Sequence, residues 1–353
     1  MASIRVLVVD DSALVRQLLT HVLTEARHIE VVGTARNGVE AVAAVKLLKP
    51  DVVTLDIQMP EMDGLEALKI IVRDSSARVV MLTSLDDPEI AYQALESGAI
   101  EFIGKPHEGL ASAIERLGTD LVRAVRTAYG VSPDKRIPSA VKDGEASNSA
   151  AEPSPGDPQH LVVIAASTGG PLALEHLFSG LRSDAPAAYL VVQHLPTGFA
   201  GSFAARLSRI AGFPVVEAVD GMRIQAGWGY VAPYGTHMCV SGAPGASTRI
   251  ELVDGPTLHG LKPSADPLFE SAAEHFGEHV TAVVLTGMGT DGAYGMAAVR
   301  KAGGATIAQD EETSVVWGMP GAAVRLEAAQ SVVPIDRVAV EVRRSLRDLG
   351  VTS

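Results

Sequence analysis

Cysteine is nearly absent from this sequence: Cys239 is the only one in 353 residues. One cysteine excludes an intrachain disulfide and a cysteine-rich zinc site, and low cysteine usage fits a reducing compartment. We expect Cys239 to be a buried apolar residue rather than a nucleophile. Long apolar runs are absent too, since none approaches the roughly 18 residues that a membrane-spanning helix needs. The sequence therefore predicts a cytoplasmic protein without a membrane-inserted segment.

Basic residues are the minority among the charged ones. The chain has 29 Lys and Arg against 42 Asp and Glu, which gives a formal net charge of -13 at pH 7. Such an excess of negative charge favours solubility and opposes binding to a phosphate backbone. We therefore expect no nucleic-acid partner. The length suits two domains of ordinary size.

Two segments alternate short runs rich in Val and Ile with helical patterns, which is typical of α/β domains whose sites lie at the carboxyl ends of parallel strands. In the first segment the expected strands are 4–9, 31–34, 52–55, 79–83 and 101–103. In the second they are 161–165, 189–193, 215–218, 229–232, 281–286, 305–308 and 331–334. Between the two, a stretch rich in Pro, Ser, Gly and charge has no apolar period and predicts a flexible linker.

Charged and hydroxyl side chains mark the strand ends of the first segment. Asp10 and Asp11 follow the first strand, and Asp56 closes the third. Three carboxylates at one sheet edge repel one another unless a hard cation neutralises them, and Mg²⁺ is the expected occupant. Such an ion would also lower the charge that opposes phosphoryl transfer onto Asp56. Thr83 and Lys105 end the last two strands and would meet the phosphoryl oxygens.

Each of these residues also has an ordinary interpretation. Asp10 or Asp11 could cap the helix that starts near Ala13, and Lys105 could be a solvated charge. Such separate roles do not account for the order of these residues at successive strand ends or for the tract D-I-Q-M-P-E-M-D-G. With these motifs, residues 3–122 resemble a response-regulator receiver domain.

The resemblance implies a flavodoxin-like parallel sheet and phosphorylation of Asp56 by the histidine kinase of a chemotaxis system. It also implies a Mg²⁺ ion bound by Asp11, Asp56 and the backbone carbonyl of Gln58, with Asp10 assisting through water. The residues that would respond to the phosphoryl group are Thr83, Phe102 and Lys105.

Three polar residues follow strands of the second segment. Ser167 lies on the tight turn A-S-T-G-G between a strand and a helix, His194 follows another strand, and Asp291 follows a third in L-T-G-M-G-T-D-G. Ser167 could instead cap its helix, and a lone strand-end histidine is often a packed residue. The three nevertheless converge on one sheet edge, in a chain order that differs from that of the α/β-hydrolases.

Further motifs surround these residues: V-Q-H-L-P-T-G-F, L-K-P-S-A-D and A-Q-D-E-E-T-S-V-V-W-G-M-P. With them, the second segment resembles the doubly wound catalytic domain of the protein-glutamate methylesterase/glutamine deamidase family of chemotaxis response regulators (CheB family). Two positions depart from the family pattern. Ala165 stands where a glycine is usual, and Lys262 stands where arginine is usual, so bidentate contacts from that position are lost.

This second resemblance implies that Ser167 attacks a glutamyl methyl ester, His194 acts as the base and Asp291 orients it. From their position after strand ends beside these three residues, the backbone N–H groups at Met288 and near Thr168 are the candidates for stabilising the oxyanion. The implied substrates are methyl-accepting chemotaxis receptors, with deamidation of receptor glutamines as a further activity. The esterase itself would need no cofactor.

The predicted domains are a receiver at 3–122, a linker at 123–159 and a methylesterase domain at 160–350. Two alternatives remain open at this stage. Residues 287–292 spell G-x-G-x-x-G between a strand and a helix, with Asp310 located 18 residues beyond Gly292, which is the pattern of a dinucleotide-binding oxidoreductase. The second domain could also be a non-catalytic output module under receiver control.

Overall fold

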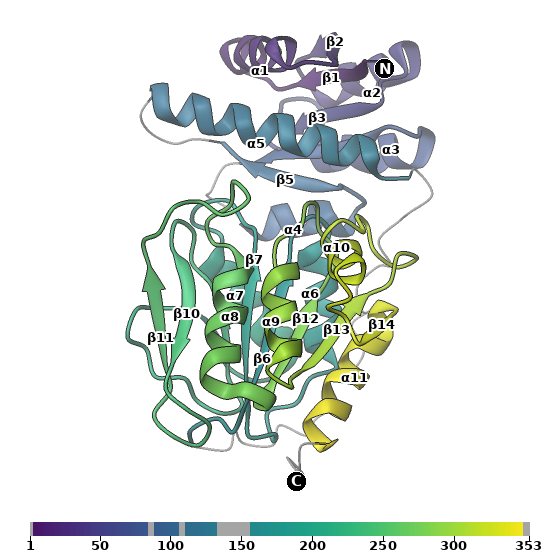
Figure 1. The fold of residues 1–353 in the computed structure, drawn as a ribbon. Coiled ribbons are helices and arrows are strands. Elements are labelled where there is room, and N and C mark those ends of the chain that lie inside the picture. Colours follow the sequence, from purple (N-terminus) through teal and green to yellow (C-terminus); the bar gives the residue numbers. More distant parts are fainter. Residues whose placement is uncertain (1–2, 84–87, 106–109, 133–155, 349–353) are drawn as a thin grey trace. The chain divides into compact units, whose positions relative to one another are not determined.

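The computed structural model describes residues 3–83, 88–105, 110–132 and 156–348, without the side chains of 110–116. The chain divides into two compact units, Met1–Pro138 and Ser139–Ser353. Each unit is an α/β domain with its own parallel sheet, as the sequence predicts (Figure 1). No described helix is both long and apolar enough to cross a membrane.

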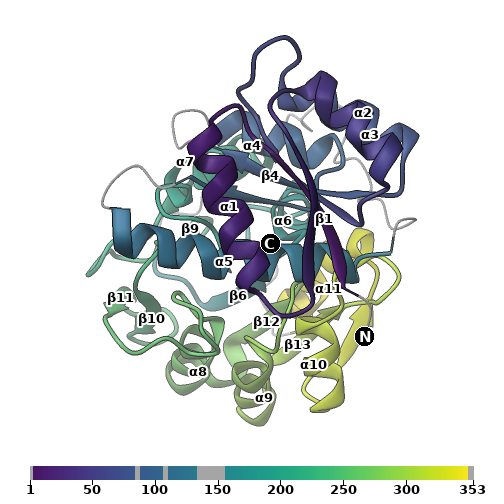
Figure 2. The same ribbon diagram turned by 90° about the horizontal axis from the view of Figure 1, so that it is seen from above.

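The first unit alternates strands and helices along the chain. Its strands are β1 (Ile4–Val9), β2 (Ile29–Ala35), β3 (Val52–Asp56), β4 (Arg78–Thr83) and β5 (Glu101–Gly104). Its helices are α1 (Ala13–Glu25), α2 (Gly38–Leu48), α3 (Gly64–Asp74), α4 (Pro88–Glu96) and α5 (Leu110–Gly130). The sheet order is β2-β1-β3-β4-β5, with all neighbours parallel. Helices α1 and α5 pack together on one face, and α2 and α3 on the other (Figure 2).

This strand order creates a switch point between β1 and β3, because the chain leaves β1 toward β2 on one side and later continues from β3 toward β4 on the other. Ligand sites of open parallel sheets lie at such points. The residue that caps α1 is Ser12, whose Oγ accepts the N–H of Val15. The cap is therefore neither Asp10 nor Asp11, and both carboxylates remain at the sheet edge.

The predicted start of the linker at residue 123 is wrong, because residues 123–130 form the last turns of α5. Leu121, Ala124, Val125 and Ala128 are fully buried at helical spacing, so this stretch belongs to the core of the first unit. Residues 133–155 of the predicted linker lie outside the described part of the chain. The other domain boundaries stay predictions.

The second unit has a larger sheet and a separate hairpin. Its strands are β6 (His160–Ala166), β7 (Ala187–Gln193), β8 (Val215–Glu217), β9 (Gly229–Val231), β10 (His237–Ser241), β11 (Arg249–Val253), β12 (Val280–Val284), β13 (Ala305–Gln309) and β14 (Ser331–Val333). Its helices are α6 (Gly170–Ser179), α7 (Ala200–Ala211), α8 (Ala265–Phe276), η1 (Gly277–His279), α9 (Ala293–Lys301), α10 (Met319–Arg325) and α11 (Ile335–Asp348).

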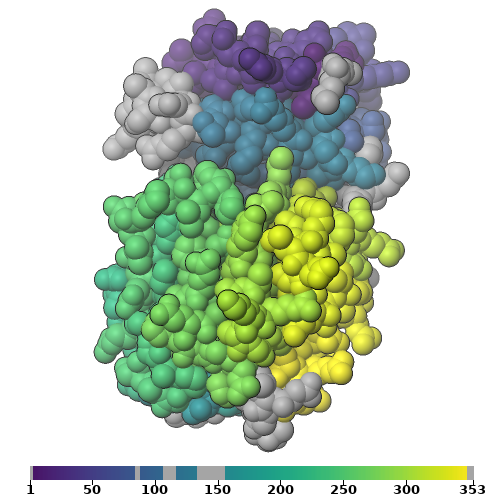
Figure 3. All heavy atoms as spheres, in the orientation of Figure 1, coloured from purple at the N-terminus to yellow at the C-terminus, as the bar shows by residue number. Residues whose placement is uncertain are grey.

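Seven of these strands form a parallel sheet in the order β14-β13-β12-β6-β7-β9-β8. Helices α8 and α9 cover one face of the sheet, and α6, α7 and α11 cover the other (Figure 1). The space-filling view shows the first of these faces closed by side chains (Figure 3). The switch point lies between β6 and β12, since β7 continues on one side of β6 and β13 on the far side of β12.

The antiparallel hairpin of β10 and β11 was not among the predicted strands. Its strands have only five residues each, and their apolar runs are no longer than three residues, so the sequence marks them weakly. Met238, Val240 and Ile250 are buried in the same apolar cluster as Leu268 and Phe269 of α8. The hairpin therefore packs on α8, which begins beside the switch point.

Candidate functional site

The strand ends of the first unit bring a lysine between two buried carboxylates. Lys105 Nζ lies 2.8 Å from Asp10 Oδ2 and 2.7 Å from Asp56 Oδ1. Asp56 Oδ1 also accepts the N–H of Ile57 at 2.8 Å. Asp11 is exposed beside them, and ligand oxygens of the three aspartates lie within 4.8 Å of one another. This donor set fits a small divalent cation.

Burial and charge act in opposite directions on these groups. Burial raises the pKa of Asp56 above its ordinary value, although the hydrogen bond from Lys105 opposes this effect. Burial also disfavours the charge of Lys105, but hydrogen bonds to Asp10 and Asp56 outweigh it and raise the pKa of the ammonium. Net negative charge remains at the edge, because the carboxylates of Asp10, Asp11 and Asp56 outnumber the neighbouring cations Lys105 and Arg16.

A pocket of about 460 Å³ opens beside these acids and is lined by Asp11, Ile57, Gln58, Met59, Asp63, Leu65 and Ile90. Gln58, the predicted carbonyl ligand, is thus at the right edge. Gly64 lets α3 approach closely, because a Cβ there would lie 2.0 Å from the carbonyl oxygen of Asp56.

The predicted phosphoryl-sensing residues are buried near this edge. Thr83 is 3% exposed, and its carbonyl accepts the N–H of Lys105 at 2.7 Å. Phe102 is 5% exposed and packs edge-on against Tyr92, with ring centroids 5.9 Å apart. The response of both residues to phosphorylation stays a prediction.

In the second unit Ser167 lies directly beyond β6, where neighbouring strands hold its backbone. Its N–H donates to the carbonyl of Thr286 at 3.0 Å, and its own carbonyl accepts the N–H of Gly170 at 2.7 Å. The N-cap residue of α6 is Gly169, with φ of +76°, and a Cβ there would lie 2.6 Å from Val315. Ser167 is therefore not the helix cap that the sequence left open.

His194 lies beside Ser167 because Ala166 and Gln193 are register partners in β6 and β7, so the next residues of both strands emerge together. The imidazole Nε2 lies 2.8 Å from Asp291 Oδ2. Because an ionised carboxylate only accepts hydrogen bonds, Nε2 carries the proton in this contact. Nδ1 is buried and has no hydrogen-bond partner among the described residues. It is the nitrogen that can accept a proton.

Asp291 is fully buried and receives hydrogen bonds from several donors. Besides His194, the donors are Ser264 Oγ and the N–H of Ala265 at the start of α8. Burial disfavours the charge, but the hydrogen bonds from His194, Ser264 and Ala265 outweigh it and lower the pKa of Asp291 below its ordinary value. The carboxylate is thus held ionised in the interior.

Two residues that the sequence did not single out connect the turns of this site. Gln193 Nε2 donates to the carbonyls of both Ser167, at 3.0 Å, and His194, at 3.1 Å. Thr286 Oγ1 donates to the carbonyl of Thr168 at 2.9 Å. Their positions pointed to the site, since Gln193 ends β7 and Thr286 lies just beyond β12. Neither residue type suggests chemistry on its own.

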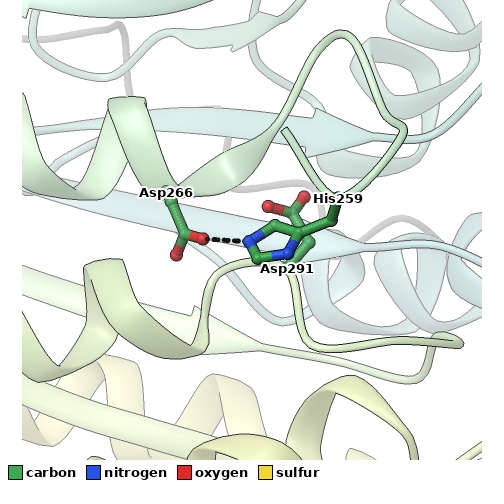
Figure 4. A group of neighbouring side chains, drawn as sticks. All are labelled: His259, Asp266 and Asp291. Atoms are coloured by element: carbon green, nitrogen blue, oxygen red, sulfur yellow. Dashed lines mark hydrogen bonds and ion pairs between the residues drawn. The ribbon is translucent and has the colours of Figure 1, made fainter. Parts of the chain in front are cut away.

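A second histidine–aspartate pair lies next to Asp291 (Figure 4). His259 Nε2 is 3.1 Å from Asp266 Oδ2, and the His259 ring lies parallel to that of Tyr294. Burial, together with the nearby charge of Asp291, raises the pKa of Asp266, although hydrogen bonds from Gly295 and His259 oppose this. His259 was not singled out from the sequence.

The three side chains in Figure 4 offer donor atoms within 4.8 Å of one another. Both carboxylates already accept hydrogen bonds from protein groups, with Asp266 bonded to Gly295 and His259. We therefore assign no metal to this cluster.

The first glycine of the tract 287–292 is crowded by protein. A Cβ at Gly287 would lie 2.7 Å from Cβ of Ser167 and 2.3 Å from Met319 Sδ. Asp310, which a dinucleotide site would use for the ribose, accepts hydrogen bonds from the N–H and hydroxyl of Thr313. The oxidoreductase alternative is not favoured.

Comparison with known proteins bears on both units. A family model described as CheB methylesterase matches residues 162–342, just over half of the 353-residue chain. A model of the response regulator receiver domain matches residues 6–115. The chain belongs to the CheB methylesterase family. The motifs quoted from the sequence thus identified the family correctly.

Relatives within the CheB methylesterase family cover nearly the whole chain. A protein from Archaeoglobus fulgidus, named protein-glutamate methylesterase/protein-glutamine glutaminase, is 44% identical over 97% of this chain and 98% of its own length. A protein of the same name from Pyrococcus abyssi is 40% identical over 98% of this chain and 96% of its own. The crystal structure of the Thermotoga maritima CheB methylesterase catalytic domain matches with a TM-score of 0.51 and 36% identity, and covers 52% of this chain and 97% of that one.

The structure shows the surroundings of Ala165 and Lys262, the two residues that depart from the CheB pattern. Ala165 is fully buried in β6. Lys262 forms an ion pair with the exposed carboxylate of Asp254, so its ammonium has a partner within its own loop. Cys239 in β10 is half-buried and not buried as expected, and partial burial raises the pKa of its thiol, which fits an unreactive side chain.

Proposed function

We propose that this chain is a phosphorylation-activated serine esterase that removes methyl groups from glutamate methyl esters of chemotaxis receptors and deamidates receptor glutamines. The observation that carries the proposal is the hydrogen bond between His194 Nε2 and Asp291 beside Ser167, at the switch point of the sheet. The names of the relatives in A. fulgidus and P. abyssi support both activities.

The geometry supports a definite route for the proton. Ser167 Oγ attacks the ester carbonyl while His194 Nδ1, the nitrogen that faces away from Asp291, takes the hydroxyl proton. The ionised Asp291 stabilises the imidazolium that forms. His194 then gives this proton to the departing methoxide, which leaves as methanol. Water, deprotonated by the same histidine, hydrolyses the acyl-enzyme and returns the proton to Ser167. For a glutamine substrate the leaving group is ammonia.

The tetrahedral oxyanion needs preorganised donors. We propose the backbone N–H groups of Thr168 and Met288, since each lies on a loop that follows a strand flanking the switch point, after β6 and β12 respectively. Thr286 supports this geometry, because its hydroxyl holds the carbonyl of Thr168.

Control is assigned to the first unit. Asp56 would accept the phosphoryl group, and Asp10, Asp11, Asp56 and the carbonyl of Gln58 would hold Mg²⁺, which neutralises charge during the transfer. The added negative charge would attract the ammonium of Lys105 and the hydroxyl of Thr83, and this movement would alter the packing of Phe102. The phosphodonor partner is the histidine kinase of a chemotaxis system, and the setting is the cytoplasm. No nucleic-acid partner is proposed for this acidic chain.

The test is methanol release from a methylated receptor, with and without a small phosphodonor. Wild-type protein should release methanol faster when phosphorylated, and Ser167→Ala should release none in either case. A folded wild-type protein that releases no methanol from any methylated receptor would remove the proposal and favour a non-catalytic output module.

A further inference from the structure

The motif L-K-P-S-A-D, residues 261–266, has no role in the mechanism above, yet one of its residues breaks a local rule. Ser264 has the extended backbone of an N-cap residue before α8, with φ of −113° and ψ of 148°. A serine there ordinarily accepts a hydrogen bond from an N–H of the first helical turn. The Ser264 side chain makes no such bond. Local rules are commonly broken at functional sites.

The hydroxyl of Ser264 donates to Asp291 Oδ1 instead, and Ser264 is fully buried. Asp291 takes over part of the capping role, because its two oxygens lie 3.1 and 2.9 Å from the N–H of Ala265. The partial positive charge of the α8 N-terminus adds to this attraction. The carboxylate is thus held from one side by the start of α8, and Oδ2 faces His194 Nε2 on the other.

Ser264 is itself fixed by a buried histidine of the hairpin. The N–H of Ser264 donates to His237 Nδ1 at 3.1 Å, and His237 Nε2 donates to the carbonyl of Pro256 at 2.9 Å. Because one ring nitrogen accepts and the other donates, His237 is neutral in this arrangement. A continuous chain of hydrogen bonds therefore runs from the hairpin through Ser264 to Asp291 and His194.

We infer that Ser264 is a positioning residue for the hydrolysis, whose hydroxyl fixes the Asp291 carboxylate toward His194, and that His237 holds Ser264 in place. The inference rests on the proposed function, because it gives Ser264 a task in that same reaction. The charged and titratable groups around Asp291 are His194 beyond β7, Asp266 of α8 and His259 of the preceding loop.

Loss of the hydroxyl has two consequences that a purely structural serine would not have. The carboxylate keeps its burial but loses one donor, so it holds a positive charge on His194 more strongly, and the acid limb of the pH–rate profile moves to higher pH. The carboxylate is also less constrained in rotation, so the base is oriented correctly for a smaller fraction of the time. This second effect lowers kcat rather than raising KM.

The experiment compares Ser264→Ala with wild type in the phosphorylated full-length chain, measuring methanol release against pH. We expect kcat to fall about tenfold, as for loss of roughly 1.4 kcal/mol of hydrogen bonding. KM should stay within about twofold, since the hydroxyl does not contact substrate. Ser264→Thr, which keeps a hydroxyl, should restore the wild-type profile. Ser271→Ala is the matched control, because Ser271 lies in α8, the helix that follows Ser264, and bonds to Val240 and Leu268 instead.

A kcat for Ser264→Ala equal to that of Ser271→Ala, or a loss of activity without movement of the acid limb to higher pH, would overturn the inference. Proton NMR gives a second readout that needs no turnover: the Nε2–H resonance of His194 should move in Ser264→Ala and stay in place in Ser271→Ala. An unmoved resonance also overturns the inference. Failure of wild type to release methanol removes the proposed function alone, and the NMR comparison still decides the role of Ser264.

Discussion

The two units place their sites at the same topological position but build them differently. In the first unit Asp10, Asp11 and Asp56 share one lysine, and the edge keeps net negative charge. In the second unit Asp291 is fully buried and bonded to His194, Ser264 and Ala265. The first site therefore keeps charge that its own side chains do not balance, whereas in the second the protein itself supplies the partners of the buried acid.

The largest effects on turnover are expected from substitutions in the site of the second unit. Ser167→Ala and His194→Ala should each lower turnover by several orders of magnitude, and the double variant should be little worse than either, because nucleophile and base act as a unit. Methanol release from a methylated receptor measures all three. Additive losses would mean that the two residues act independently, against the geometry at β6 and β7.

Asp291→Asn should lower kcat by roughly 10³- to 10⁴-fold. An asparagine can donate its amide N–H to Nε2 of His194, which would move the ring proton to Nδ1 and block proton transfer from Ser167. Asp266→Asn is the matched control, since Asp266 is a buried neighbouring carboxylate bonded to His259 rather than to His194. Equal losses in the two variants would show that the site responds to local charge and not to orientation of the base.

Substitutions in the site of the first unit should change only the stimulation of methanol release by phosphorylation. Asp56→Asn should leave basal methanol release unchanged and abolish stimulation by a phosphodonor, which for typical coupling energies is about 5- to 150-fold. Asp51→Asn should keep the stimulation, because Asp51 lies at the opposite end of β3, where it accepts the N–H of Arg5. Stimulation that survives in Asp56→Asn would place the phosphoryl group elsewhere.

The same contrast explains what the sequence could predict. Asp10, Asp56, Ser167 and His194 each lie at or directly after a strand, so strand patterns and the parallel-sheet rule predicted that these residues gather at the carboxyl edges of the two sheets. Ser264 could not be found this way, because it precedes a helix, where capping already accounts for a serine. It also bonds to His237 of a hairpin whose strands were not predicted.

Details that depend on packing were also beyond the sequence. The end of α5 was assigned to the linker because Ala residues give a weak apolar signal, although Ala124 and Ala128 are fully buried. The nitrogen of His194 that faces Asp291 is also not set by a local pattern. It depends on tertiary structure, because His194 follows β7 and Asp291 follows β12, two strands on opposite sides of β6.

The comparison extends to buried ionisable groups outside the second site. Lys105 stays charged because Asp10 and Asp56 pair with it, and these hydrogen bonds raise its pKa despite burial. His160 in β6 has no such partner: its Nε2 bonds to Thr281 Oγ1 at 2.9 Å, and Nδ1 has no hydrogen bond within the described structure. Burial, with a smaller contribution from His279, lowers the pKa of His160 to about 3.

The smallest expected effect follows from this histidine and concerns stability. An unfolded histidine titrates near pH 6.5, so between about pH 6.5 and 3 the unfolded chain binds a proton that the folded chain does not, and stability falls as pH falls. The loss between pH 7 and pH 5 should be about 2 kcal/mol.

Urea unfolding followed by tryptophan fluorescence measures this loss of stability in the second unit, because Trp228 and Trp317 are the two tryptophans of the chain. His160→Leu removes the titrating group while Thr281 keeps its bond to Ser345, so the urea midpoint should depend much less on pH, whatever its value at pH 7. His176→Gln, at a partly exposed position of α6, should leave the pH dependence unchanged. A wild-type midpoint that does not fall between pH 7 and pH 5 would mean that His160 is protonated in the folded protein, and the contrast with Lys105 would then be lost.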